Sequence, residues 1–117
     1  MSVRAKKLIN KNAAVERTRV VCYGYKEAAK QITFGSHITL RHGPNYHDDH
    51  NVIQVLADGI VCGNVIHKKV PGDRIAKIKN NDELIHLIED GMTAYLVSKR
   101  NYEMIIDIPN GKYDGLL

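Results

Sequence analysis

The sequence predicts a small, mainly β domain of the α+β type. We expect a partly closed barrel of six short strands, with one or two helices between the fourth and fifth strands. The chain has 117 residues, enough for one domain with a single modest core. Short runs rich in β-branched and aromatic residues recur between turns marked by Gly, Pro and Asn. Helices and strands do not alternate along the chain, which favours a barrel over a βαβ sheet.

The strands are identified by apolar runs bounded by turn residues. Asp58-Gly59 is typical of a two-residue hairpin turn between the third and fourth strands. Gly24, inside the first strand, indicates a bulge or a close approach of another backbone segment. One helical turn is expected at residues 27–30, in a polar connection. The six strands are expected at residues 19–25, 37–42, 51–56, 60–66, 93–98 and 102–108.

One helical region is expected between the fourth and fifth strands. Ile75 and Ile78 are three residues apart and begin the helical spacing. Asn80 and Glu83 then have the spacing of a capping box ahead of further apolar residues. Gly91 is the expected helix stop.

Positive charge is concentrated at the start of the chain. Residues 1–19 contain six Lys or Arg and one acidic residue, whereas the rest carries eleven basic and twelve acidic groups. We therefore expect a basic N-terminal arm at residues 1–18, followed by a domain at residues 19–117. Such an arm attracts phosphates or anionic surfaces, and Arg17 and Arg19 would extend it as a basic track. The alternative is a solvated tail that aids solubility.

Other features of the composition place the chain outside several classes. No apolar run approaches the ~20 residues needed to span a bilayer, and the charged start lacks the apolar segment of a secretory signal. A cytoplasmic location without membrane contact is expected. Cys22 and Cys62 lie within apolar runs and are expected as small buried side chains, without a disulfide. They lack the CxxC spacing of a zinc site.

The most informative stretch is LRHGPNYHDDHNVIQV at residues 40–55, a strand, a polar loop and a second strand. With VVCYGY at 20–25 and GNVIH at 63–67, it resembles the HIRAN domain family. Members of that family are small OB-like β-barrels, often found beside Swi/Snf-type helicases, that bind DNA ends. The segments that match the family pattern within the central stretch are LRHGPN at 40–45, Asp49, and NVIQV at 51–55.

The resemblance implies binding of single-stranded DNA or DNA 3′ ends, in DNA repair or processing. An aromatic ring such as that of Tyr25 offers a face on which a base can stack. Arg41, His67 and Lys68 would contact phosphates. No catalytic residue and no cofactor are expected, so a helicase or nuclease activity would belong to a partner chain. The residues expected to bind nucleic acid are Tyr25, Arg41, His42, Asn45, Asp49, Asn51, His67 and Lys68.

The chain departs from the family pattern at a few positions near the expected ligand surface. His42 and Gly43 stand where the pattern has Arg and an acidic residue. Asp48 replaces a loop Tyr, and Asn64 replaces an aromatic residue after the glycine of the fourth strand.

Two other functions are compatible with the sequence. The loop at 42–50 is dense in His and Asp, and His42, His47 and His50 are candidate metal ligands. A hydrolytic enzyme would need that site. Alternatively, the apolar strand at 102–108 could be buried at an interface, which predicts a protein-interaction module or a homo-oligomer.

Overall fold

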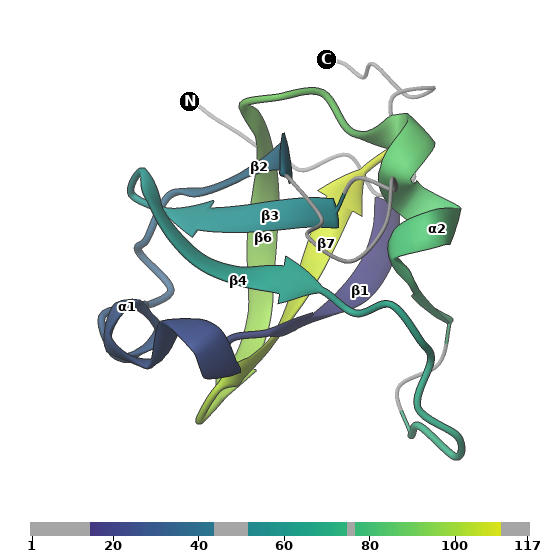
Figure 1. The fold of residues 1–117 in the computed structure, drawn as a ribbon, viewed down its shortest axis with the longest axis horizontal. Helices are drawn as coiled ribbons and strands as arrows, with labels where there is room; N and C mark the ends of the chain where they lie inside the picture. The colour runs from purple at the N-terminus through teal and green to yellow at the C-terminus, as the bar shows by residue number, and fades with distance from the viewer. Residues whose placement is uncertain (1–14, 44–51, 75–76, 111–117) are drawn as a thin grey trace.

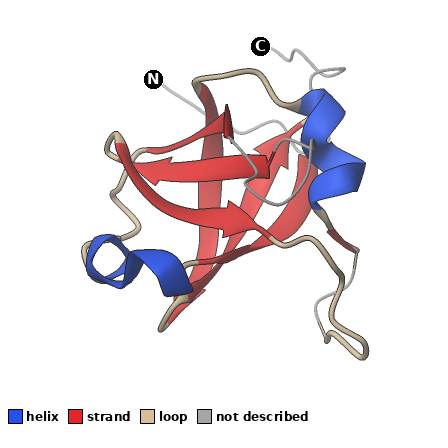
Figure 2. Cartoon of the chain, in the orientation of Figure 1, coloured by secondary structure: helices blue, strands red, loops and turns tan. Residues whose placement is uncertain are grey.

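The computed structural model describes residues 15–43, 52–74 and 77–110. This part of the chain is a mainly β domain with seven strands in one sheet and two short α-helices (Figures 1 and 2). The strands are β1 Val15–Val21, β2 Ile38–Gly43, β3 Val52–Ala57, β4 Ile60–Val65, β5 Ile78–Lys79, β6 Met92–Arg100 and β7 Glu103–Pro109. The helical segments are the 3₁₀ turn η1 Tyr23–Tyr25, α1 Lys26–Lys30, α2 Asn81–Leu84 and the 3₁₀ turn η2 Ile85–Leu87.

The sheet curls into a ring. Its strand order is β4-β3-β2-β6-β7-β1-β5, and β4 also pairs with β1. That last pairing is antiparallel and joins Val20 to Val65 and Val21 to Asn64. Strand β5 lies outside the ring, parallel to β1. Within the ring all neighbouring strands are antiparallel.

The main core fills the inside of the ring. Alternate residues of the strands point inward, so that Val20, Leu40 and Ile106 are fully buried. Helices α1 and α2 lie at opposite sides of the ring (Figure 1). Ala29 of α1 and Leu84 of α2 belong to the same buried cluster, so both helices cover the core.

A smaller apolar cluster lies on the outer face of the sheet. Ile66 and Ile78 pack against Ile105 of β7, with Val21 and Val97 beside them. The segment between Ile66 and Ile78 is therefore attached to the outside of the ring at both of its ends.

Several local predictions are confirmed. Asp58 and Gly59 form the turn between β3 and β4, with φ angles of 51° and 86°. Asn80 and Glu83 form the expected capping box at the start of α2. A helical turn is present at Lys26–Lys30.

Other local predictions are wrong. The first strand begins at Val15 and ends at Val21, because residues 15–18 pair with the end of β7 and the chain turns into η1 after Cys22. Ile78 belongs to β5, where it pairs with Arg17, and not to a helix. The helical segment ends at Leu87, and Gly91, at a φ of 90°, serves the turn into β6.

The strand predicted at 102–108 is present as β7 and lies inside the ring of strands. Strand β7 sits between β6 and β1, and its residues Met104, Ile106 and Ile108 are buried in the core. Its apolar side chains therefore stabilise this domain itself. Residues 1–14 of the expected arm lie outside the described residues, and none of the described helices is long and apolar enough to cross a bilayer.

Candidate nucleic-acid interface

A depression of about 620 Å³ lies on the outer surface, between η1 and the end of β4. One wall comes from the turn that follows β1, and the other from the segment that leaves β4. Tyr25, His67 and Lys68, which the sequence predicted as binding residues, thus line one opening. Tyr23 and Asn64 line it as well but were not selected from the sequence. The aromatic and polar lining residues are Tyr23, Tyr25, Asn64, His67 and Lys68.

The wall formed by Tyr23 and Tyr25, here called the aromatic wall, is supported by a contact with Tyr102. The ring of Tyr23 contacts that of Tyr102, with centroids 5.8 Å apart and planes at 56°. The ammonium group of Lys26 lies 5.4 Å from the Tyr102 ring centroid, a favourable cation–π arrangement. Tyr23 remains 58% exposed, and a Cβ on the neighbouring Gly24 would meet no atom within 4 Å. A flat aromatic face is therefore oriented and open to a ligand.

The opposite wall, here called the basic wall, is formed by His67 and Lys68. His67 and Lys68 are exposed, and neither makes a hydrogen bond or ion pair within the described residues. The next residue, Lys69, differs because its ammonium group lies 3.0 Å from a carboxylate oxygen of Glu83. Lys68, but not Lys69, is thus the cation available to an anion in the depression.

Asn64 lies where β3, β4 and β1 meet. It pairs with Gln54 of β3 and with Val21 of β1. Within the described residues, its side-chain Oδ1 is buried and has no hydrogen-bond partner. Burying an amide oxygen without a hydrogen-bond partner is unfavourable, and a ligand or water molecule that donates to it would remove this cost.

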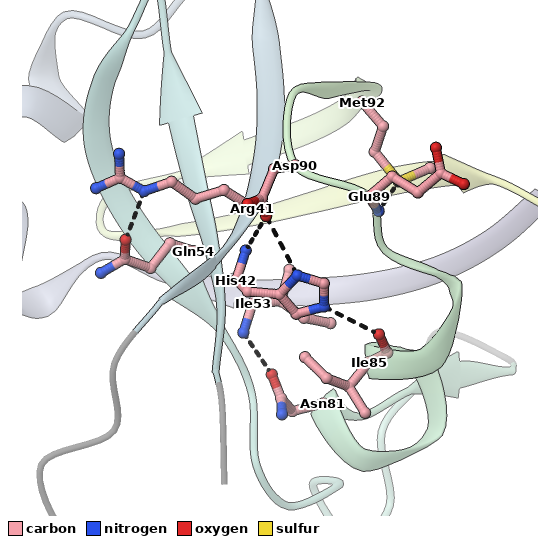
Figure 3. Close-up of polar contacts among 9 residues, drawn as sticks. All are labelled: Arg41, His42, Ile53, Gln54, Asn81, Ile85, Glu89, Asp90 and Met92. Atoms are coloured by element: carbon pink, nitrogen blue, oxygen red, sulfur yellow. Dashed lines mark hydrogen bonds and ion pairs between the residues drawn. The ribbon is translucent and has the colours of Figure 1, made fainter.

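A row of paired residues connects the depression to Arg41. Arg41 pairs with Gln54, and Gln54 pairs with Asn64, so the three side chains share the outer face of the sheet. Arg41 Nε donates a hydrogen bond of 2.9 Å to Gln54 Oε1 (Figure 3). Since neighbouring strands lie about 4.8 Å apart, Arg41 is about 10 Å from Asn64 along this row.

Gly43 makes this arrangement possible. A Cβ at Gly43 would lie 2.4 Å from the Cγ and Cδ atoms of Gln54. Only glycine leaves room for the Gln54 side chain to lie across β2 and accept the hydrogen bond from Arg41. Glycine at position 43 thus has a packing reason.

His42 does not line the depression. It points to the other side of β2 from Arg41, toward the η2–β6 connection (Figure 3). Its backbone N–H donates to Asp90 Oδ1 at 2.7 Å, and its ring nitrogens lie 3.2 Å from that oxygen and 3.4 Å from the carbonyl oxygen of Ile85. The hydrogen bond from the His42 backbone, aided by the imidazole, lowers the pKa of Asp90. His42 therefore ties β2 to the helical side of the ring.

Arg17 and Arg19 do not form a basic track. Arg17 binds Asp107 with two hydrogen bonds of 2.7 and 2.9 Å. Arg19 binds Asp73 at 2.7 and 2.8 Å and Glu103 at 2.9 Å. The pKa of each arginine is raised, chiefly by the hydrogen bond to its aspartate. Both cations are thus neutralised by acidic partners on the same face of the sheet.

Part of the predicted site lies outside the described residues, namely Asn45, Asp49 and Asn51. The same holds for His47 and His50, so the metal hypothesis for loop 42–50 stays a prediction. Among the residues that the structure describes, no group of three or more His, Cys, Asp or Glu side chains could hold a metal ion.

The depression combines an aromatic face, an imidazole, an ammonium group and an amide around one opening. Such a set can stack a flat ring and bind an attached anionic group. Sequence reasoning selected Tyr25, His67 and Lys68 but missed Tyr23, although the Tyr-Gly-Tyr repeat was a signal for it. Comparisons of this chain with protein-family models, with curated proteins and with solved structures found no match.

Proposed function

We propose that this chain is a nucleic-acid-binding module that binds single-stranded DNA or a DNA 3′ end in the depression between η1 and β4. The observation that carries the proposal is the pairing of an oriented aromatic wall with the uncommitted His67 and Lys68 around one opening. Stacking of a base on an aromatic ring stabilises single-strand complexes by about 1–3 kcal/mol. Lys68 and His67 would contact the phosphate of the stacked nucleotide.

The row from Asn64 to Arg41 supports a binding path longer than one nucleotide. The row spans about 10 Å. This is longer than the rise of about 3.4 Å that separates neighbouring nucleotides in a duplex strand. The ends of the guanidinium group of Arg41 make no hydrogen bond within the described residues and are placed for a second phosphate. The strand would therefore run across β4, β3 and β2.

The architecture supports the same reading. We propose that the ring of β4, β3, β2, β6, β7 and β1 is an OB-like barrel of the HIRAN kind, with β5 added outside it. OB-like barrels bind oligonucleotides across their outer strand faces. In DNA repair or processing, the motor or nuclease activity would come from a partner chain.

Fluorescence anisotropy with a labelled single strand tests the proposal. We expect the affinity to fall with salt, with a log–log slope of about −0.7 for each phosphate contacted. The change Lys68→Gln should make that slope less negative by about 0.7, the value for one phosphate contact. Lys69→Gln is the matched control, because Lys69 is adjacent but already paired with Glu83, and it should leave the slope unchanged.

The end preference is tested with the same strand carrying a free or a blocked 3′ hydroxyl. Tighter binding of the free end is the expected result. Equal binding of both would leave a general single-strand binder without end recognition. Negligible binding of both at low salt would overturn the proposed function.

A protein-interaction module is the second candidate. Its supporting observation is the exposure of two large apolar side chains, Phe34 at 71% and Ile60 at 64%. Exposed apolar side chains mark a contact site for another protein where they form one contiguous patch. Sedimentation velocity distinguishes the candidates, since a mass that rises with concentration, together with no oligonucleotide binding, would favour this one.

A further inference from the structure

The two walls of the depression come from distant parts of the chain, yet both are tied to one residue. Arg19 of β1 holds Asp73 through Nη2 and Glu103 through Nη1. Its side chain is only 17% exposed and that of Asp73 only 12%. We propose that Arg19 is a positioning residue that sets the width of the depression, without touching the nucleic acid itself. This inference rests on the proposed function for its binding readout.

The basic wall is held by Arg19 at both ends. At its start, the backbone N–H of Ile66 donates to the carbonyl oxygen of Arg19 at 3.1 Å. At its end, the turn from Val70 to Asp73 is closed by a backbone hydrogen bond of 3.1 Å, with Gly72 at a φ of 73°. That turn presents the carboxylate of Asp73 to the Arg19 guanidinium group. His67 and Lys68 lie between these two attachments.

The aromatic wall is held through Glu103. Glu103 pairs with Val21 in the sheet and directly follows Tyr102. The carbonyl oxygen of Tyr102 accepts a hydrogen bond of 2.7 Å from the N–H of Cys22, and its ring supports Tyr23. The ion pair between Arg19 and Glu103 thus fixes the start of β7. The residue just before it, Tyr102, contacts the ring of Tyr23 in the aromatic wall.

Removal of the guanidinium group would affect both walls together. Asp73 and Glu103 would lose the cation between them, and two carboxylates close to one cation site repel each other once it is gone. Lysine cannot replace arginine fully, because its single ammonium nitrogen cannot take the place of both Nη2, which binds Asp73, and Nη1, which binds Glu103. The order of expected affinity is therefore arginine, then lysine, then glutamine at this position.

The test compares Arg19→Gln and Arg19→Lys with Arg17→Gln. Arg17 is the matched control, because it lies on the same face of β1 and also binds an aspartate with two hydrogen bonds, but it does not bridge the two walls. For a labelled single strand at low salt, we expect Arg19→Gln to weaken binding by about tenfold, and Arg19→Lys by less. Arg17→Gln should stay within about twofold of the unmodified chain.

The salt dependence separates positioning from direct contact. A positioning residue changes affinity but leaves the log–log salt slope unchanged, whereas loss of a phosphate contact reduces it. A reduced slope for Arg19→Gln, or an affinity equal to that of Arg17→Gln, would overturn the inference. If Arg19→Gln does not fold by circular dichroism, the same comparison is made with Arg19→Lys.

Amide hydrogen exchange gives a readout that does not depend on a ligand. Exchange should rise in residues 67–73 and at the start of β7 in Arg19→Gln, and not in Arg17→Gln. Absence of binding by the unmodified chain would count against the proposed function alone. Unchanged exchange in Arg19→Gln would count against the role of Arg19 alone.

Discussion

At the scale of single residues, Gly63 has the tightest surroundings on the closing edge of the ring. A Cβ there would lie 2.7 Å from Val20 Cγ1, 2.8 Å from the Val21 carbonyl oxygen and 3.0 Å from Cys22 Sγ. The backbone oxygen cannot move without breaking the pairing of β1 with β4. The close approach of these two strands therefore requires glycine.

The change Gly63→Ala should lower the free energy of unfolding by about 1–3 kcal/mol, because the added methyl group forces the two strands apart. Urea denaturation measures the effect. Gly24→Ala is the control, since a Cβ there meets no atom within 4 Å, and it should stay within about 0.5 kcal/mol. Equal stability of the two variants would contradict the close approach of β1 and β4.

The two thiols test the interior of the ring. Burial raises the pKa of Cys22 to about 11 and that of Cys62 to about 12. At pH 8 both are thus protonated and inaccessible, and an aromatic disulfide reagent should label them slowly in the native chain and rapidly in denaturant. Because the folded-state pKa values are raised, their contribution to stability is present below pH 9.0 and lost as pH rises through 11 to 12. Rapid labelling of the native chain would show that the core is open.

The candidate site was predictable only in part at this scale. Tyr25, His67 and Lys68, which were selected because aromatic and basic residue types indicate nucleic-acid contacts, line the same depression. His42, which was predicted together with Arg41, points to the other side of β2, because neighbouring residues of a strand point to opposite faces. Which of the two faces is the outer one depends on the partners of β2, and those partners are distant in sequence.

At the scale of elements, α2 depends on its cap. Asn80 Oδ1 accepts a hydrogen bond from the Glu83 N–H, and Glu83 Oε1 accepts one from the Asn80 N–H, each at 3.0 Å. The helix has only four residues, so it cannot be stable without such contacts and its packing on the core. The cap thus positions the residues that cover one side of the ring.

Asn80→Ala should destabilise the domain by about 1 kcal/mol in urea denaturation, while Asn80→Ser keeps a capping oxygen and should cost little. Glu83 adds a pH dependence. Its pKa is lowered, chiefly by the hydrogen bond from the Asn80 backbone and then by Lys69. Its contribution is therefore present above its ordinary pKa of 4.5 and lost as pH falls through the lowered value. The difference in unfolding free energy between the unmodified chain and Glu83→Gln should therefore shrink in acid. A difference that stays constant would contradict this role of Glu83.

One turn and one helix cap that depend on adjacent residues were predicted correctly, whereas two segments that depend on distant partners were not. The Asp58-Gly59 turn and the Asn80 cap depend on residues next to one another, and both are present. Strand β5 and the first half of β1 exist because they pair with segments more than 50 residues away. No local pattern in the sequence reports such pairings.

At the scale of the whole molecule, ion pairs reduce the positive charge on one part of the outer face of the sheet. The ion pairs of Arg17 and Arg19 remove two cations from the outer face of β1. Lys68 and the ends of the Arg41 guanidinium group make no ion pair within the described residues, and with His67 they lie along the path on which we propose that DNA binds. The closure of β4 on β1 brings this path and the aromatic wall together, and the sequence alone does not reveal that closure.

The most direct measurement is a two-dimensional ¹H–¹⁵N NMR titration of the labelled chain with a short single-stranded DNA. We predict that the shifted amides cluster at Tyr23–Tyr25 and at residues 64–68, with smaller changes at Arg41 and none in α2. A spectrum that stays unchanged at saturating DNA, or one whose changes gather around α2 and leave η1 unaffected, would contradict the account.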